Sequence, residues 1–312
     1  MKNLATPRAP AAPLNAAMYE SHYLTATDPA GGRALWLRHT TLKRPGEPAR
    51  PTVWVTWFQR PGAHPRALRV TAAEPPSDPT GAWARSRLGE LSPGHASGAI
   101  EGASWSLAWE APMAEVPYLP SRWLYDRPIP RSNGAALIPS ATVHGTLTLD
   151  GEAPVSVDGW DLMVGHNWGS EHADHWTWVH AGGLGVDRSG WFDLALARVK
   201  VGPLLTPWAA GGVVDLNGRT FRTRVRGSVR REVEGESTLL TVPLAGGAAL
   251  ELRVTAPDAD TVSWDYASPR GPGRTVRNCS IADGSLTLRQ DRFAQKLEIK
   301  GRVAVEHGSP AS

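Results

Sequence analysis

Short strand-like runs separated by turn residues recur along almost the whole chain, and this pattern limits the fold more than any other feature. Apolar, β-branched or aromatic residues fill each run, and Gly, Pro, Asp or Asn lie between runs. Examples are residues 51–58 (PTVWVTWF), 103–109 (ASWSLAW), 142–149 (TVHGTLTL), 190–199 (GWFDLALARV) and 248–256 (AALELRVTA). Strands at this spacing predict an all-β antiparallel sandwich or barrel.

Helical periodicity is scarce, so we expect few short helices. The best helical candidate is residues 82–91 (AWARSRLGEL), which end before a Ser-Pro-Gly sequence. Asp150-Gly151 and Asn217-Gly218 are strong hairpin signals. The proline-rich segment 112–130 also contains Trp, Leu and Tyr. It therefore predicts an ordered loop of the kind that often carries function over a barrel mouth.

The chain of 312 residues is long enough for two domains. The strand-like runs fall into two sets, one up to about residue 165 and a second after an unusual polar-aromatic segment. We therefore expect a flexible leader over residues 1–13, an N-terminal domain over 14–170 and a C-terminal domain over 171–308. The leader is rich in Pro and Ala and lacks the apolar run of a signal peptide.

Charge and cysteine content exclude several classes of protein. The net charge is only +3, and the basic run from Arg219 to Arg231 is followed at once by Glu232, Glu234 and Glu236. We therefore expect no nucleic-acid partner. No stretch reaches the roughly 20 apolar residues of a transmembrane helix. The single cysteine, Cys279, excludes an intramolecular disulfide framework and reads as an inert core thiol, which is compatible with a cytoplasmic location.

Tryptophan is unusually abundant, with 14 Trp against four Phe and five Tyr. Tryptophan supplies a large apolar surface together with an N–H donor that needs a partner. A chain that needed only core volume would use Leu, Ile, Val and Phe. Part of these residues would fill the core, and the others predict a cavity for a hydrophobic small molecule.

Residues 165–181 have the composition of a site rather than of an ordinary connection between strands. The segment reads GHNWGSEHADHWTWVHA and contains four His, two acids and three Trp. Trp176, Trp178 and His180 alternate along its second half, so they share one face of a strand.

The GHNWGSEH sequence followed by WTW resembles the His-x-Trp-Gly signature of the carotenoid hydratase (hydroxyneurosporene synthase) and AttH-like family. Tocopherol cyclase and the fungal lipocalin-type Diels–Alderases are similar at a greater distance. ESHYLTATDPAGGRALWLRHT near the N-terminus and the strands before the signature fit the same pattern, so the resemblance covers most of residues 19–215. It implies two tandem lipocalin-like (calycin) β-barrels or sandwiches, and scaffolds of this kind host hydration, cyclisation and cycloaddition.

Family hydratases pair the His-x-Trp motif with an aromatic-x-Asp motif slightly under thirty residues later, whose Asp protonates an alkene. The matching positions here are His166 and Trp168, then Trp191 and Asp193. The spacing is slightly shorter than in the family pattern, and the aromatic residue is Trp instead of Tyr. The resemblance thus implies Asp193 and His166 as catalytic residues.

The local pattern around Asp193 predicts a site independently of the resemblance. In residues 191–197 one strand face carries Trp191, Asp193, Ala195 and Ala197, and the other carries bulky apolar residues. Burial among apolar neighbours raises a carboxyl pKa, as a general acid near neutral pH requires. The structural alternative is an Asp that pairs with Arg198 or Arg38 or points to water.

The remaining candidate residues are expected to bind the substrate. Aromatic faces can stabilise a cation or stack on a polyene, although the same residues could pack the domain interface. His166 could equally be structural, through hydrogen bonds to the backbone. For Asn167 and Glu171 the structural role, hydrogen bonding to turn amides, is favoured. The predicted substrate-binding residues are Trp168, Trp191, Trp176, Trp178, Trp36, Arg38, Trp54 and Asn167.

Metal and cofactor binding are not expected. Glu171, His172 and His175 lie within five residues, with His166 near. The spacing is not His-Glu-x-x-His on a helix, and the surroundings are strand and turn. A two-histidine-plus-carboxylate site is conceivable there but is not our prediction.

The sequence thus predicts a cofactor-independent enzyme, a hydratase (lyase) or an isomerase/cyclase of secondary metabolism, that acts on an isoprenoid- or polyketide-like substrate. Asp193 would supply the proton, and His166 would orient a water or a substrate oxygen. Two alternatives remain open: a carrier that binds a lipid or terpenoid unchanged, and a pericyclase that acts by confinement. The oligomeric state, monomer or dimer, is also left open, as is whether the pocket lies inside one barrel or between two, with the N-terminal barrel and the junction favoured.

Overall fold

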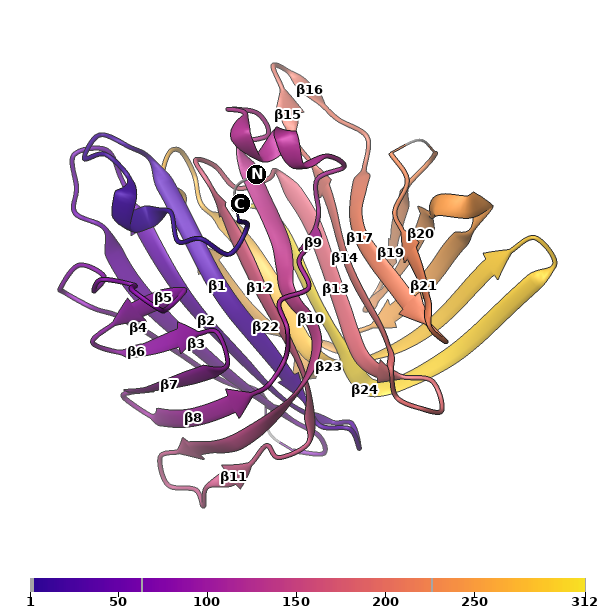
Figure 1. Cartoon of the computed structure of the whole chain (residues 1–312), viewed down its shortest axis with the longest axis horizontal. Helices are drawn as coiled ribbons and strands as arrows, with labels where there is room; N and C mark the ends of the chain where they lie inside the picture. Colours follow the sequence, from indigo (N-terminus) through magenta and orange to yellow (C-terminus); the bar gives the residue numbers. More distant parts are fainter. Residues whose placement is uncertain (1–2, 63, 226, 312) are drawn as a thin grey trace.

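A computed structural model describes residues 3–62, 64–225 and 227–311. The chain forms two large, strongly curved antiparallel sheets, one from each half of the sequence, which lie side by side (Figure 1). The all-β prediction is therefore confirmed. The helical segments among the described residues are short 3-10 turns: η1 (Ala9–Ala11), η2 (Arg122–Asp126), η3 (Ala245–Gly247) and η4 (Asp258–Asp260).

The first sheet takes its strands from residues 18–169. Its strand order is β4-β3-β2-β1-β12-β10-β8-β7-β6-β5, with β9 and β11 also paired to β10. The strands are β1 (Met18–Thr27), β2 (Arg33–Lys43), β3 (Arg50–Gln59), β4 (Arg66–Thr71), β5 (Ala84–Ser86), β6 (Gly89–Ser92), β7 (His95–Ile100), β8 (Ala103–Trp109), β9 (Val116–Pro117), β10 (Ser132–Leu149), β11 (Val155–Ser156) and β12 (Trp160–Gly169).

The second sheet has the order β18-β17-β14-β13-β24-β23-β21-β20-β19, with β22 paired to β23. Its strands are β13 (His175–Leu184), β14 (Gly190–Arg198), β17 (Ala209–Leu216), β18 (Arg219–Arg222), β19 (Arg230–Glu234), β20 (Ser237–Pro243), β21 (Ala249–Thr255), β22 (Val262–Tyr266), β23 (Arg274–Gln290) and β24 (Phe293–Pro310). β15 (Lys200–Val201) and β16 (Leu204–Leu205) form a separate hairpin. The expected division at residue 170 falls in the connection between the two sheets, which runs from Gly169 to His175.

Side-chain alternation along the central strands of the first sheet decides which residues face which core. On β2, Leu35 and Leu37 point into a core made by the N-terminal half alone. Ala34 and Trp36, on the other face of β2, belong to the core of the C-terminal half. The central strands of the first sheet are therefore covered on both faces, and the second core is completed by residues of the first half.

The two predicted hairpin turns form as expected. Leu216 pairs with Arg219, so Asn217 and Gly218 make a two-residue turn, with φ of 54° and 69°. Gly151 also has a positive φ, of 84°, in the connection between β10 and β11. Both positions need a conformation that Asn and Gly adopt readily.

The helix predicted over residues 82–91 is wrong. This segment forms a hairpin in which Ala84 pairs with Leu91 and Ser86 pairs with Gly89. Trp83 and Leu91 are buried in the N-terminal core. Pairing with β7 supplies backbone partners that outweigh the weak local preference for helix.

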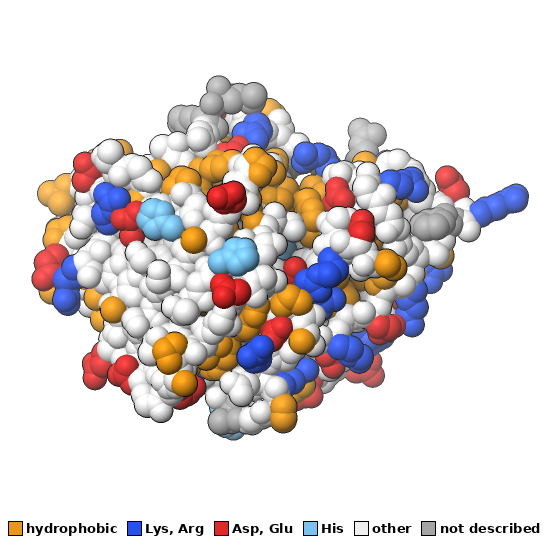
Figure 2. Space-filling view, turned by 60° about the horizontal axis from the view of Figure 1, so that its bottom comes forward, with side chains coloured by type: hydrophobic (Ala, Val, Ile, Leu, Met, Phe, Trp, Pro, Cys, Tyr) orange, Lys and Arg blue, Asp and Glu red, His pale blue; other side chains and the backbone are white. Residues whose placement is uncertain are grey.

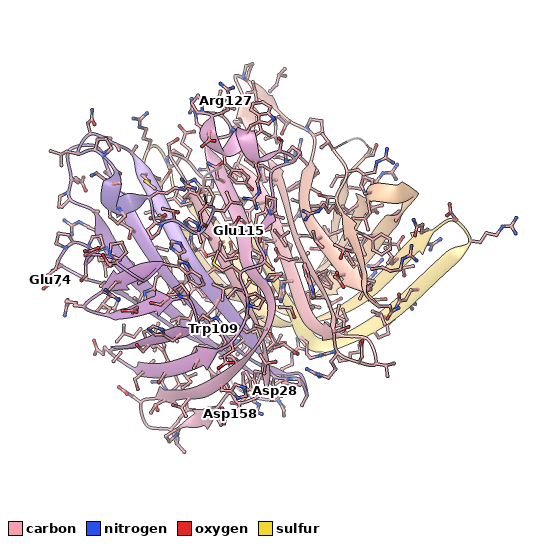
Figure 3. The ribbon with its side chains drawn as sticks, in the orientation of Figure 1. Asp28, Glu74, Trp109, Glu115, Arg127 and Asp158 are labelled. Atoms are coloured by element: carbon pink, nitrogen blue, oxygen red, sulfur yellow. The ribbon has the colours of Figure 1, made fainter. Side chains whose placement is uncertain are left out.

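The flexible leader expected over residues 1–13 also differs from the structure, which describes this segment from residue 3 onward. Leu4 and Ala9 are buried, at 1% and 3% exposure. The Leu4 backbone N–H donates to Glu115 Oε1 at 2.8 Å, and Figure 3 labels Glu115 near the middle of the molecule. The segment is a packed part of the N-terminal half, because Ala5 joins the N-terminal core and Leu4 packs with Tyr125 and Trp168.

The surface carries mixed charge. On the face in Figure 2, basic and acidic side chains are interspersed with apolar ones. Among the described residues, none of the helical segments has the length and apolar character needed to cross a bilayer.

Candidate functional site

A cavity of about 290 Å³ lies between the two halves of the molecule. Strands β1 and β2 of the first sheet form one wall, and β13, β14 and β17 of the second sheet form the other. The pocket thus lies between the two halves, a question that the sequence had left open. Its lining includes Tyr19, Tyr23, Trp36, Arg38, Tyr118, Asn133, Asn167, His172, Trp176, Trp178, Ala195, Ala197, Trp208, Gly211, Tyr266 and Glu306.

Strand β14 presents its two faces as the sequence predicts. Phe192 and Leu194 are fully buried in the core of the C-terminal half. Asp193 and Ala195 point the other way, toward the first sheet, and Ala195 lines the cavity. The small side chain of Ala195 leaves the space that a larger residue would fill.

Asp193 is fully buried just behind the cavity wall. Its Oδ2 accepts a hydrogen bond from the Tyr118 hydroxyl at 2.7 Å, and its Oδ1 accepts one from the Trp178 indole N–H at 2.9 Å. The His180 Nδ1 lies 3.7 Å from Oδ1. Asp193 therefore pairs neither with Arg198 nor with Arg38, and both groups that donate to it line the cavity.

Tyr118 and Tyr23 connect this carboxyl group to the cavity. The Tyr118 hydroxyl donates to Asp193, so in its hydrogen bond with Tyr23 it is the acceptor. Burial and the nearby Asp193 charge raise the pKa of both phenols well above the ordinary value. The result is a buried chain Tyr23–Tyr118–Asp193 that runs from the lining to the carboxyl group.

Three glycines make room for these phenols. A Cβ on Gly211 of β17 would overlap the Tyr118 carbonyl oxygen, and a Cβ on Gly134 of β10 would lie 2.9 Å from its ring. A Cβ on Gly165 of β12 would overlap the Tyr23 ring. Tyr118 is thus held in a slot between the two sheets.

Arg38 is a buried cation in the aromatic part of the lining. Its Nε donates to the Ser21 hydroxyl at 2.6 Å, and its guanidinium lies 4.0 Å from the centroid of the Tyr266 ring. No carboxylate forms an ion pair with it anywhere in the described ranges of the chain. A buried guanidinium that lacks a carboxylate partner favours a ligand oxygen or anion.

Glu306 of β24 forms hydrogen bonds with two aromatic residues of the cavity lining. Its two oxygens accept hydrogen bonds from the Trp176 indole at 2.9 Å and from the Tyr266 hydroxyl at 2.9 Å. Burial is the first reason that the pKa of Tyr266 lies well above its ordinary value. These bonds fix the planes of two aromatic rings that face the cavity.

The polar remainder of the lining includes His172 and two amides. His172 lies 3.9 Å from the Tyr19 ring, and burial and the Arg38 charge lower its pKa to about 3, so it is neutral at physiological pH. The carbonyl oxygens of Asn133 and Asn167 are buried without a hydrogen-bond partner in the described part of the chain. Such oxygens can accept a bond from a ligand N–H or O–H.

Several predicted site residues do reach the cavity. Residues Trp36, Arg38, Asn167, Trp176 and Trp178 line it, and Asp193 lies directly behind it. Trp54 packs edge-on against Tyr266, with ring centroids 5.5 Å apart, and so supports the lining from outside. Trp191 packs in the small cluster around Tyr23 and Trp178 without lining the cavity.

His166 and Trp168 differ from the prediction. Both point away from the cavity, toward the N-terminal half, because they lie on the opposite face of β12 from Asn167. His166 Nδ1 lies 2.6 Å from the Leu4 carbonyl oxygen, and Trp168 stacks on His166 with ring centroids 4.4 Å apart. His166 therefore cannot orient a water or substrate in this cavity.

Sequence reasoning missed Tyr23, Tyr118, Tyr266 and Glu306. The signal for Tyr118 was present, since the proline-rich segment 112–130 was expected to be an ordered loop over a pocket. Nothing local singles out Tyr23 or Glu306, which lie on ordinary strands.

The structure does not bring together the side chains that the sequence analysis considered for a metal site. Glu171 forms an ion pair with Arg131, and His172 lines the cavity. Within the described ranges, the group of side chains close enough to share an ion is instead Glu20, His22 and His166.

Comparisons with known proteins agree with the fold. No protein-family model matches the chain. Uncharacterised proteins of Mycobacterium tuberculosis strains CDC 1551 and H37Rv are each 28% identical over 314 residues, covering 94% of this chain and 90% of the relative.

Two solved structures are similar over nearly the whole chain. An AttH-type protein from Nitrosomonas europaea superposes with a TM-score of 0.54 at 16% identity, covering 95% of this chain and 93% of its own. CghA, solved with Sch210972, has a TM-score of 0.57 at 11% identity, covering 95% and 89%. The AttH-like, lipocalin-like fold implied by the sequence resemblance is therefore confirmed.

Proposed function

We propose that this protein is an enzyme that holds a hydrophobic isoprenoid- or polyketide-like molecule between its two sheets and hydrates, isomerises or cyclises it by proton transfer. The observation that carries this proposal is the buried Tyr23–Tyr118–Asp193 chain. A carrier would gain affinity from a purely apolar wall, since a buried carboxyl group costs free energy unless it is well bonded. A carboxyl group linked to a cavity by hydroxyls is instead suited to moving a proton.

Tyr118 is the residue that we propose transfers a proton directly to the substrate. Asp193 supplies that proton through Tyr118. When Asp193 carries a proton, it can give that proton to the Tyr118 oxygen while Tyr118 gives its own proton to the substrate. The substrate then bears the positive charge, which the faces of Trp36, Trp176 and Trp178 can stabilise. Loss of a proton from the product, or from an added water, returns a proton along the same chain.

Arg38 suggests that the substrate also carries an oxygen. Its guanidinium can donate to a carboxylate, enolate or carbonyl group at one end of an otherwise apolar molecule. The unpartnered amide oxygens of Asn133 and Asn167 would bind a hydroxyl or N–H on the same molecule. The expected substrate is thus amphipathic, with its polar end at Arg38.

The proposal is tested by turnover in D₂O. Purified protein is incubated with an organic extract of the source cells, and the products are analysed by untargeted mass spectrometry. A new product that carries carbon-bound deuterium, and that the Tyr118→Phe variant does not form, supports proton-initiated chemistry. Recovery of every bound compound unchanged contradicts the proposal and leaves a carrier.

A pericyclase is the second candidate, favoured by the small residues that shape one wall. Ala195 and Ala197 leave open space beside Trp178 and Trp176, their cross-strand partners. The similar fold of CghA was solved with the organic molecule Sch210972, so this fold can hold such a ligand. A pericyclase would form an isomer without deuterium, and Ala195→Leu would reduce its turnover more than Tyr118→Phe.

A further inference from the structure

Three buried side chains of the N-terminal half converge on a point outside the cavity. Glu20 and His22 come from β1 and His166 from β12, where His22 and His166 are direct cross-strand partners. Their exposures are 4%, 2% and 0%. One ligand atom from each lies within 4.8 Å of the other two.

Each of the two imidazoles forms a hydrogen bond with the N-terminal segment through one of its ring nitrogens. His166 Nδ1 faces the Leu4 carbonyl oxygen, which can only accept, so this nitrogen carries the hydrogen. His22 bonds to the Ala5 backbone, and its Nε2 has no partner among the described residues. An imidazole that donates one N–H to a carbonyl oxygen presents a lone pair on the other nitrogen, as metal-binding histidines do.

The contact between His166 and Glu20 shows why a cation fits here. His166 Nε2 lies 3.0 Å from Glu20 Oε1. The Nε2 lone pair and the carboxylate oxygen are both acceptors, so they repel unless a proton or a cation lies between them.

We propose that Glu20, His22 and His166 bind a divalent transition-metal ion of the zinc class through one carboxylate oxygen and two Nε2 atoms. Two imidazoles and one carboxylate are an established ligand set for such ions. The two rings are stacked with centroids 3.8 Å apart, so binding requires them to turn until their lone pairs converge.

The site is structural, and it holds the N-terminal segment. Glu20 accepts backbone N–H bonds from Arg8 at 2.7 Å and Ala9 at 2.8 Å, while the two histidines bond to Leu4 and Ala5. Every ligand therefore also anchors residues 4–9. The site faces the N-terminal core, on the other side of β1 and β12 from the cavity, so it stands independently of the proposed function.

The test is metal binding by the full-length chain. The protein is stripped with a chelator, dialysed, and titrated with ZnCl₂ by calorimetry and with CoCl₂ by visible absorption. We expect about one equivalent per chain, a Co²⁺ spectrum with nitrogen ligation, and a higher Tm with Zn²⁺. Zn²⁺ should also slow proteolytic cleavage within residues 3–13.

Glu20→Gln and His22→Gln test the ligands, and His39→Gln is the matched control because His39 is equally buried on β2 but outside the group. We expect both ligand variants to weaken binding at least about tenfold, with His39→Gln unchanged. Wild-type protein that binds neither ion overturns the proposal, even if the variants fail to fold. Folded ligand variants that keep wild-type affinity overturn it as well.

Discussion

The two faces of strands β1 and β12 carry two different buried polar clusters. Toward the second sheet, Tyr23 and Asn167 line the cavity, where hydroxyl and amide groups are open to a ligand. Toward the N-terminal core, His22 and His166 are covered by the N-terminal segment. Adjacent residues of one motif, His166 and Asn167, therefore serve different sites, since alternate side chains of a strand point to opposite faces.

This comparison shows how far a linear motif can mislead about a site. The His-x-Trp and aromatic-x-Asp motifs were predicted to act together, yet the sheet separates His166 from Asp193. The cavity side is built for a ligand, because its polar atoms are left partly unpaired. The core side is closed to a ligand, so substitutions there should change the stability of the protein.

The largest expected effect is on turnover and belongs to the cavity side. Asp193→Asn should lower turnover by about 10²–10⁴-fold, because the amide cannot supply a proton to Tyr118. Trp168→Phe, on the other face of β12, should leave turnover nearly unchanged. Both are measured on the reaction identified in D₂O, with near-ultraviolet circular dichroism as the check on folding. Equal losses of turnover in the two variants would contradict the different roles of the two strand faces.

The next largest effect is on stability and belongs to the core side. His166→Ala should lower the free energy of unfolding of the metal-free protein by about 3 kcal/mol, since it removes the buried hydrogen bond to the Leu4 carbonyl and leaves a cavity where the imidazole stacks on Trp168. Urea denaturation followed by tryptophan fluorescence measures the change. A loss no larger than that of an exposed control, His95→Ala, would argue against a structural role.

Substitution of Arg38 should weaken the binding of acidic ligands selectively. Arg38→Met keeps the volume but removes the charge, so a polyene carboxylic acid such as retinoic acid should bind about tenfold more weakly. Its methyl ester should bind the variant about as well as it binds the wild type. Quenching of tryptophan fluorescence gives both dissociation constants. Equal weakening for acid and ester would show that Arg38 acts through packing alone.

The smallest expected effect is a pH dependence from His172. Its pKa is about 3 in the folded protein and about 6.5 when unfolded, so the unfolded state takes up the proton first as the pH falls. The stability contributed by neutral His172 is complete above pH 6.5 and is lost as the pH falls toward 3. Between pH 7 and pH 6, His172→Phe should reduce the loss of stability by about 0.7 kcal/mol. Identical pH profiles for the two proteins would contradict a neutral His172.

Local pattern was sufficient for the elements with strong local signals. The Asn217-Gly218 turn and the two faces of β14 follow from backbone geometry and from alternation within the strand, so the sequence predicted both. Residues 82–91 were mistaken for a helix because the pairing with β7 that completes their hairpin lies outside the segment. The packed N-terminal segment was missed because two of its anchors, Glu115 and His166, lie more than 100 residues away in sequence.

The sequence by itself determined that this chain is all-β, that its fold is AttH-like, and that Asp193 shares a face with small residues. Only the tertiary structure decided that the cavity lies between the sheets, that Tyr118 links Asp193 to it, and that His166 faces elsewhere. The reason is physical. Alternation fixes which side chains share a face of a strand, but strand order, set by pairing across the whole chain, decides what each face meets.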